Sequence, residues 1–234
     1  GDWSSDVCSS DLVSSLGVLL FVLYCVFYRS LPGGYIIKVI STCIRSLFQP
    51  RLRHVFDDSE ITYRVWFCDI DNYGHMNNSC YNLYCDYGRY NCAIRLFGIK
   101  ALRSAYCVVG TADIQYIRSM KLFQKFVLRT SVVAVSGKNV MFRQVFESNG
   151  KVYAIAMMRM VFLDSHYRTV LGKDVFAEIA PSLCNDVNWD EDRCSAPHHK
   201  ELADQYISLN EGIKDSLEAD YKDKLIPLQI RSIR

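Results

Sequence analysis

The chain has 234 residues, of which 50% are apolar and 22% are charged, and its net charge is only +2 at neutral pH. A chain of this length and composition can bury one substantial core, so the sequence is not that of a disordered protein. Because the charge is nearly balanced, the sequence lacks the broad cationic field on which nucleic-acid binding depends, and we expect no nucleic-acid partner.

The first segment, residues 1–12, has no apolar periodicity, although a long apolar run follows it directly. Its sequence from Asp2 to Leu12, DWSSDVCSSDL, is the translation of a common sequencing-adapter string. We therefore interpret residues 1–12 as adapter-derived, with the native N-terminus and its initiating Met missing. A native exon that encodes this segment would contradict the interpretation.

Residues 13–28 (VSSLGVLLFVLYCVFY) are almost purely apolar, and Arg29, Lys38 and Arg45 follow before the first acid, Asp57. These sixteen residues span roughly 24 Å as a helix, against a hydrocarbon core of ~30 Å. The cations that follow favour a membrane anchor, which we expect at the endoplasmic reticulum with the domain facing the cytosol. A cleaved signal, which would give a secreted domain, and a buried helix are the alternatives.

Residues 29–56 form the next segment, an apolar-basic linker that we expect to be helical. Between Tyr35 and Phe48 the apolar side chains recur at helical spacing, at Ile36, Val39, Ile40, Cys43, Ile44, Leu47 and Phe48. Two interpretations remain open. The helix lies along a membrane surface, or it is an ordinary amphipathic linker.

Residues 57–182 have the residue pattern of a folded α+β domain. Ile61 to Cys68 (ITYRVWFC) reads as a strand, and a polar turn from Asp69 to Asn78 follows it. A helix is predicted from Ser79 to Phe97, with Asn77 or Asn78 as its N-cap. This helix is apolar on nearly every face, which is typical of a buried helix. Gly88 inside it costs about 1 kcal/mol relative to Ala, which predicts close packing at that position.

Four further strands are predicted, and the turn Ser148-Asn149-Gly150 is a hairpin signal. They are Tyr106 to Tyr116, Phe123 to Val135, Asn139 to Glu147 and Val152 to Leu163. One buried helix between a first strand and an antiparallel meander predicts an α+β fold in which the sheet wraps the helix. Residues 183–234 are predicted to be a helical extension, with an exposed, solvated helix from Lys200 to Lys224.

The chain contains ten cysteines, which are scattered through apolar stretches such as those around Cys43, Cys68, Cys80, Cys85, Cys92 and Cys107. Such usage indicates free, buried thiols and favours a reducing compartment. There is no C-x-x-C pair, and His198 and His199 have no thiols near them in sequence, so we expect no metal site. We also expect no cofactor.

One string, from Asp69 to Tyr81 (DIDNYGHMNNSCY), resembles the D-x-D-x-x-G-H-x-N-N-x-x-Y signature of the 4-hydroxybenzoyl-CoA thioesterase-like branch of hot-dog proteins. The stretch from Val108 to Tyr116 and the Asn-Gly hairpin are also similar, and the likeness covers about Thr62 to Asp164. The flanks, with Leu31-Pro32 and the run LFQPRLR, look like the membrane-anchored subgroup typified by thioesterase superfamily member six. The resemblance implies a hot-dog fold, acyl-CoA thioesterase activity and a homodimer.

The resemblance maps the catalytic carboxylate, a nucleophile or general base, onto Asp71. A helix N-terminus carries partial positive charge and unpaired N–H groups, so the N–H of Asn78 is our candidate donor to the thioester oxyanion. The alternative is that Asp71 is only a turn or capping acid. Asp69 is predicted to be structural.

The substrate-binding candidates are His75, Asn77, Tyr81, Arg118 and Lys138. His75 either contacts the substrate or orients the loop, and Tyr81 is either a ligand contact or a core residue. CoA phosphates need cationic partners. The basic turn of the family maps onto Ser136-Gly137-Lys138, where only Lys138 is positive, and Arg118 and Lys121 can supply further charge.

The sequence contains no G-x-S-x-G elbow, no P-loop and no dinucleotide fingerprint, which disfavours serine hydrolases and nucleotide enzymes. The leading prediction is therefore an acyl-CoA thioesterase. A fatty acyl group is favoured because the anchor would hold the site near a bilayer. The alternative is a non-catalytic hot-dog protein that binds lipids or acyl groups, or acts as a scaffold, at a membrane.

Overall fold

The computed structural model describes residues 5–27, 33–100, 106–184, 187–190 and 193–220. The helices are α1 (Ser5–Phe27), α2 (Gly34–Leu47), α3 (Asn78–Phe97), α5 (Gly172–Ile179), α6 (Pro181–Cys184) and α7 (Lys200–Asp220). The strands are β1 (Ser59–Arg64), β2 (Tyr106–Tyr116), β3 (Lys125–Ser136), β4 (Asn139–Ser148), β5 (Lys151–Leu163) and β6 (Arg193–Ser195). Three short 3₁₀ turns complete the set: η2 (Phe67–Asp69), η3 (Gly98–Lys100) and η4 (Pro197–His199).

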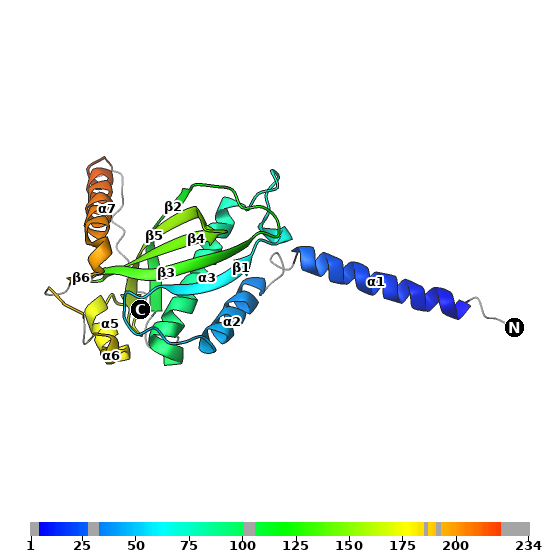
Figure 1. The fold of residues 1–234 in the computed structure, drawn as a ribbon, viewed down its shortest axis with the longest axis horizontal. Coiled ribbons are helices and arrows are strands. Elements are labelled where there is room, and N and C mark those ends of the chain that lie inside the picture. The colour runs from blue at the N-terminus through cyan, green and yellow to red at the C-terminus, as the bar shows by residue number, and fades with distance from the viewer. Residues whose placement is uncertain (1–4, 28–32, 101–105, 185–186, 191–192, 221–234) are drawn as a thin grey trace.

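The strands form one antiparallel sheet in the order β1-β3-β4-β5-β2, and β6 pairs with β3. The sheet curves around α3, which crosses its concave face (Figure 1). This arrangement confirms the predicted α+β hot-dog fold. It also leaves β2 at one edge of the sheet and β1 at the other, which determines what each edge can contact.

Helix α3 is buried along most of its length, as its apolar pattern predicts. Its rings pack against rings from the sheet, with Tyr84 5.1 Å from Phe126 and Tyr81 5.1 Å from Phe146 between centroids. The helix begins where expected, because the Asn77 side chain accepts a hydrogen bond from the N–H of Ser79. The core of the domain therefore lies between α3 and the sheet.

The sheet approaches α3 most closely at Gly88. A Cβ atom there would lie 2.6 Å from Thr130 Oγ1, 2.7 Å from Gln144 Nε2 and 2.7 Å from a Leu128 methyl group. No real Cβ atom tolerates such distances, so only glycine allows the helix to sit this deep. The close packing predicted at this position is confirmed.

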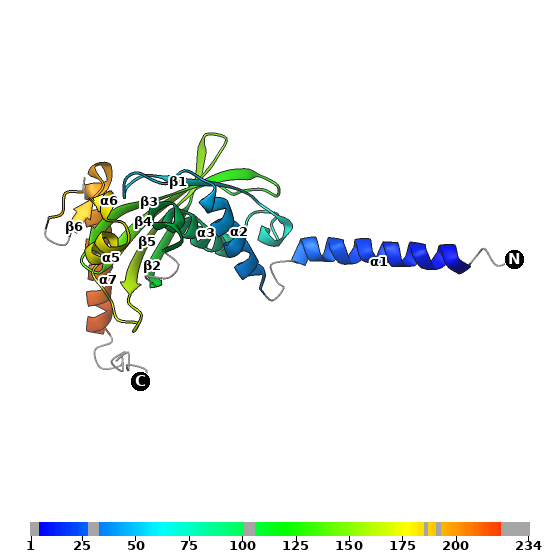
Figure 2. The same ribbon diagram turned by 90° about the horizontal axis from the view of Figure 1, so that it is seen from below.

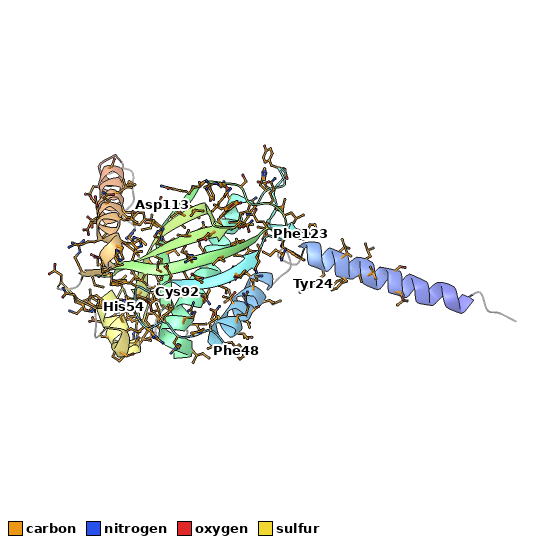
Figure 3. All side chains as sticks on the ribbon, viewed as in Figure 1. Tyr24, Phe48, His54, Cys92, Asp113 and Phe123 are labelled. Carbon is orange, nitrogen blue, oxygen red and sulfur yellow. The ribbon has the colours of Figure 1, made fainter. Side chains whose placement is uncertain are left out.

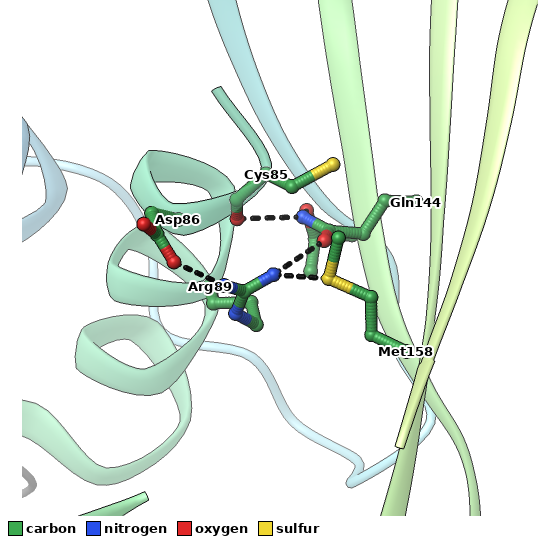
Figure 4. A network of polar contacts seen from close by, with 6 residues as sticks. Cys85, Asp86, Arg89, Gln144 and Met158 are labelled. Carbon is green, nitrogen blue, oxygen red and sulfur yellow. Dashed lines mark hydrogen bonds and ion pairs between the residues drawn. The ribbon is translucent and has the colours of Figure 1, made fainter. Parts of the chain in front are cut away.

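Polar side chains fasten the helix to the sheet beside Gly88 (Figure 4). The Gln144 amide nitrogen donates to the Cys85 carbonyl at 3.0 Å and to Thr130 Oγ1 at 2.9 Å. Its oxygen accepts a hydrogen bond from Arg89 at 3.2 Å, and Arg89 also forms an ion pair with Asp86. Arg89 is only 9% exposed, so this pairing compensates a charge that burial would otherwise make costly.

Helix α2 packs against α3 through small polar side chains. Thr42 Oγ1 lies 3.0 Å from the Tyr63 hydroxyl, and the Asn91 amide donates to Ser46 Oγ at 2.8 Å and to Gln49 at 2.6 Å. The most buried residues of α2 are therefore small or polar, Val39 packs against the core, and the other aliphatic side chains of α2 point away from the domain.

Two segments, β1 and α7, differ from the sequence predictions. Strand β1 ends at Arg64 and not at Cys68, because the next residues form the η2 turn. Helix α7 was predicted to be an exposed helix with a solvated charged face, but its Ala203 and Tyr206 are buried against β3 and β4. The predicted end of α7, residues 221–224, lies outside the described residues. The elements α5, α6 and β6 had no clear sequence signal.

Helix α1 extends away from the domain and crosses the predicted boundary between residues 1–12 and 13–28 (Figure 2). Its described side chains, from Val13 to Tyr24, are all exposed. Among the described residues, no helix has both the length and the apolar character that crossing a membrane requires.

The cysteines whose side chains are described are free thiols, as predicted. Cys80, Cys85 and Cys92 are buried, and burial raises the pKa of Cys92 to about 12. The prediction of a buried thiol is wrong for Cys107, which lies exposed on the edge strand β2.

We predict that Gly88→Ala destabilises the protein although Ala is the better helix former. The new methyl group overlaps Thr130, Gln144 and Leu128, and such overpacking costs about 1–3 kcal/mol. The matched control is Gly212→Ala in α7, where no atom lies within 4 Å of the new Cβ and a gain of up to about 1 kcal/mol is expected. Urea unfolding measures both, and equal effects of the two substitutions would contradict the packing argument.

Candidate active site

The connection from β1 to α3 is ordered by the carboxylate of Asp69, which is 0% exposed. Its Oδ2 accepts hydrogen bonds from the Trp66 backbone N–H and the Tyr84 hydroxyl, both at 2.8 Å. Its carbonyl oxygen accepts the N–H of Asn77 at 2.7 Å. Asp69 therefore joins the η2 turn to the start of α3, in agreement with the structural role predicted for it.

Asp71 has a different environment, in the half-buried loop that follows. Its Oδ1 accepts the backbone N–H groups of Tyr73 at 2.9 Å and His75 at 3.2 Å, and its own N–H donates to the His75 carbonyl at 2.8 Å. Gly74 makes this tight turn with a φ of 73°. No described residue donates a hydrogen bond to Oδ2. The turn thus holds the carboxylate by one oxygen and leaves the other available.

The N-terminus of α3 lies at the end of the same loop. The Asn77 carboxamide oxygen accepts hydrogen bonds from both the N–H and the hydroxyl of Ser79 at 2.9 Å, so this side chain is the helix cap. The N–H of Asn78 has no hydrogen-bond partner among the described residues, and the Asn78 carbonyl accepts the Tyr116 hydroxyl at 3.3 Å. An unpaired N–H at the positive end of a helix is a suitable donor for an anion.

The segment between β2 and β3 lies beside the loop from Asp71 to Asn78. We call this loop, the N-terminus of α3 and the adjoining β2–β3 segment the corner. His75 and Lys121 form an isolated antiparallel bridge. Arg118 is exposed and its guanidinium donates to the Val152 carbonyl at 2.6 Å. His75, Lys121 and Arg118 are therefore at the same end of the sheet as Asp71.

Tyr81 belongs to the core. It is 2% exposed, and its ring lies 5.1 Å from the rings of both Tyr116 and Phe146. Burial raises its pKa to about 12, so its hydroxyl stays protonated at neutral pH. Of the two interpretations of Tyr81, the geometry favours the core residue.

Lys138 is not brought to the corner. Strand β3 begins at Lys125, which pairs with Arg64 just before the loop, and it ends at Ser136 before the turn that carries Lys138. The twelve residues of β3 span roughly 40 Å at about 3.3 Å each. Within one chain Lys138 therefore lies at the opposite end of the sheet from Asp71. Its contact with CoA stays a prediction.

A cavity of about 470 Å³ lies between the C-terminal half of α3 and the edge of the sheet. Its walls are mostly apolar, with one ion pair, and include Asp86, Arg89, Ala93, Phe97, Val108, Val109, Phe142, Met160 and Phe162. The sequence analysis missed this cavity. The available signal was the polar row at Asn78, Asn82, Asp86 and Arg89, whose spacing places these residues on one face of an otherwise apolar helix.

The corner presents a carboxylate, an imidazole and a free backbone N–H. Such a set can attack or activate water toward an acyl carbon and stabilise the negative charge that forms on its oxygen. Within the described part of the chain, no three His, Cys, Asp or Glu side chains are grouped so as to hold a metal ion.

Comparison with known proteins identifies the family of this chain. The model of the thioesterase-like superfamily matches residues 65–199. Protein THEM6 of Danio rerio is 33% identical over 129 residues, which cover 53% of this chain and 64% of that relative. The chain thus matches less than two thirds of the length of this relative.

Among solved structures, the probable thioesterase YbaW of Escherichia coli is similar with a TM-score of 0.49, at 19% identity over 53% of this chain and 98% of that one. The DHNA-CoA thioesterase of Staphylococcus aureus has a TM-score of 0.46, at 11% identity over 66% of this chain and 95% of that one. The family match covers α3, the loop that precedes it and the strands β2 to β6. This chain is a member of the thioesterase-like superfamily, with the hot-dog fold.

Proposed function

We propose that the protein hydrolyses acyl-CoA thioesters at the N-terminus of α3. The observation that carries the proposal is the pairing of two available groups on one short loop. The Asp71 carboxylate has one oxygen without a hydrogen bond from the described residues, and the Asn78 N–H has no partner among them.

In the proposed reaction, Asp71 either attacks the acyl carbon or removes a proton from the attacking water. The thioester oxygen gains negative charge as the carbon becomes tetrahedral, and the Asn78 N–H and the helix dipole stabilise that charge. Collapse of the intermediate breaks the carbon–sulfur bond and releases CoA as a thiolate, which takes up the proton lost by the hydrolytic water. If Asp71 is the nucleophile, water then hydrolyses the acyl-aspartate anhydride.

The position of the cavity beside α3 indicates that the acyl group is a long chain. Asn78 and Asp86 lie on one face of α3 and are eight residues apart, which is about 12 Å along the helix, or roughly ten carbons of an extended chain. Beyond Asp86 the cavity is lined mainly by apolar side chains. A fatty acyl chain that begins at Asn78 can therefore bury its distal carbons there.

One observation favours the non-catalytic alternative. Lys138, the only cation in the turn that corresponds to the basic turn of the family, is remote from Asp71 in the same chain. The candidates that do lie at the corner end of the sheet, Arg118 and Lys121, are exposed. A protein that binds acyl groups without turnover remains the second candidate.

We predict that Asp71→Asn lowers kcat/KM on acyl-CoA by about 10²–10⁴-fold, because the amide can neither attack nor accept a proton. The amide oxygen still accepts the N–H groups of Tyr73 and His75, so the stability should change by less than about 1 kcal/mol. Asp174→Asn, an exposed acid on α5, is the control. Unchanged turnover in Asp71→Asn would overturn the assignment. If the wild-type protein binds a non-hydrolysable acyl-CoA but does not hydrolyse acyl-CoA, the non-catalytic candidate is correct.

We predict that Ala93→Phe, which fills the cavity beside α3, lowers kcat/KM for octadecanoyl-CoA, whose chain is long enough to reach Ala93, by about tenfold or more. Butyryl-CoA is too short to reach Ala93 and serves as the internal control, with a change of less than about twofold expected. A kinetic panel of chain lengths measures both effects. If the two substrates lose activity equally, the acyl chain does not occupy this cavity.

We also infer that the functional unit is a homodimer joined at β2. This eleven-residue edge strand is exposed along most of its length and carries only one charged residue, Asp113. Edge strands of monomers are usually shielded by lysine, proline or a covering element. Pairing with a second β2 would satisfy its free backbone groups, and the family resemblance implies such a dimer.

Val109→Lys on β2 should raise the dimer dissociation constant at least about tenfold, because the added charge is buried when two edges pair. Sedimentation velocity over a dilution series measures it, and Leu209→Lys on the exposed face of α7 is the control. A wild type that stays monomeric at all concentrations would disprove the proposed dimer.

The expected location at the endoplasmic reticulum, with the domain facing the cytosol, stays a prediction. Imaging of the tagged protein together with protease protection in microsomes tests it. The exposed apolar side chains of α1 and α2 support a membrane location.

A further inference from the structure

Helix α2 carries its apolar residues on the outside of the domain. The exposed fractions of five aliphatic side chains lie between 51% and 60%: Ile36, Ile37, Ile40, Ile44 and Leu47. Phe48, at the end of the helix, is 86% exposed and points away from the domain (Figure 3). An apolar face of this size on an isolated protein indicates an interaction surface.

The side of α2 that contacts the domain is mainly polar, although Val39 packs against the core. Thr42 and Ser46 are 1% and 2% exposed, and both form hydrogen bonds with the domain. Because these bonds fix the rotation of α2, the aliphatic face cannot turn inward without breaking them.

A shallow cationic pocket lies along one flank of α2. It has a volume of about 450 Å³, and its lining includes four cations and two aromatic rings: Lys38, Arg45, Arg64, Lys125, Tyr63 and Trp66. None of the residues that line it is acidic. Four cations in one pocket repel one another, so the pocket is electrostatically suited to an anion.

Local contacts hold these cations in place. The Lys38 ammonium and the Arg45 guanidinium each lie 5.5 Å from the centroid of the Tyr63 ring. Arg45 also donates to the Thr62 carbonyl at 3.0 Å, and Arg64 donates to the Phe123 carbonyl at 2.9 Å. The pocket is therefore preorganised by the fold.

The chemistry of the two features identifies one occupant. Lys38 follows Ile37 directly and Arg45 follows Ile44, so the cations border the apolar face. The sequence has no Asp or Glu from residue 13 to residue 56. An apolar stripe bordered by cations matches the boundary between lipid headgroups and acyl chains. We propose that α2 lies on a bilayer surface, with its apolar face among the acyl chains and a phosphorylated lipid headgroup in the cationic pocket.

The phosphates of CoA are the other source of a suitable anion. The pocket is formed by α2, β1 and β3, whereas Tyr116 of β2 contacts Asn78 at the proposed site of hydrolysis. Strands β1 and β2 are the opposite edges of the sheet. Arg64 and Lys125 nevertheless lie at the end of the sheet that carries the Asp71 loop, so free CoA is included as a competitor in the test. The adjoining apolar face of α2 favours the lipid, and the inference does not depend on the proposed hydrolysis.

The pocket is tested by lipid selectivity. The full chain is titrated with phosphatidylcholine vesicles that contain phosphatidylinositol 4-phosphate, and with phosphatidylcholine vesicles alone. The ratio of the two affinities is the readout, because the contribution of α1 cancels in it. Lys38→Gln/Lys125→Gln should lower this ratio at least tenfold, and the charge-matched control Lys151→Gln/Lys200→Gln should leave it unchanged.

The apolar face is tested separately, with vesicles of the same composition. Ile40→Gln/Ile44→Gln should weaken binding at least tenfold, while Leu209→Gln/Ile213→Gln, an equally exposed pair on α7, should not. All four side chains are about half exposed, so each variant should keep its thermal unfolding midpoint.

Two results would overturn the proposal. One is that the pocket or face variants bind like wild type. The other is that free CoA displaces the phosphoinositide vesicles, which would assign the pocket to the nucleotide. Hydrolysis of butyryl-CoA without vesicles should be unchanged in all four variants, so a failure here is distinct from a failure of the proposed enzyme activity.

Discussion

The close approach of α3 to the sheet at Gly88 is the constraint on which the rest of the structure depends. Only a residue without a side chain lets Thr130 and Gln144 reach the helix backbone, and Gln144 then pairs with Arg89. Because the helix is fixed in depth and rotation there, the position of its N-terminus is fixed as well. The orientation of the Asn78 N–H is therefore set by packing about ten residues away.

The two acids of the loop, Asp69 and Asp71, have different roles: one holds the fold together and the other is available for the reaction. Asp69 points into the core, where Trp66 and Tyr84 donate to it. Asp71 points into the turn and uses one oxygen to hold it. A buried carboxylate that holds core donors stabilises a fold, whereas a more exposed carboxylate with one oxygen that no described residue engages can still react. The different surroundings favour Asp71 for the chemistry.

The sequence predicted α3 and the four long strands because their side-chain periods are strong and local. The sequence-based predictions failed where tertiary contacts determine the structure. β1 stops at Arg64 because Asp69 caps the turn that follows, and α7 buries Ala203 and Tyr206 although the helix is largely polar. At the site, the loop residues were identified from the motif. The cavity beside α3 was missed because it requires β2 and β5 as its other walls.

Helix α2 shows why a periodic pattern cannot say which face turns inward. Each half-exposed isoleucine forgoes about 1 kcal/mol of burial, so the exposed apolar face of α2 forgoes roughly 6 kcal/mol in water. The hydrogen bonds to Thr42 and Ser46 return only about 1 kcal/mol each. The inward packing of Val39 adds to these bonds, but the outer face still leaves a large apolar area in water. A non-aqueous phase over that face would remove this cost, and the neighbouring cations suit an anionic bilayer in that place.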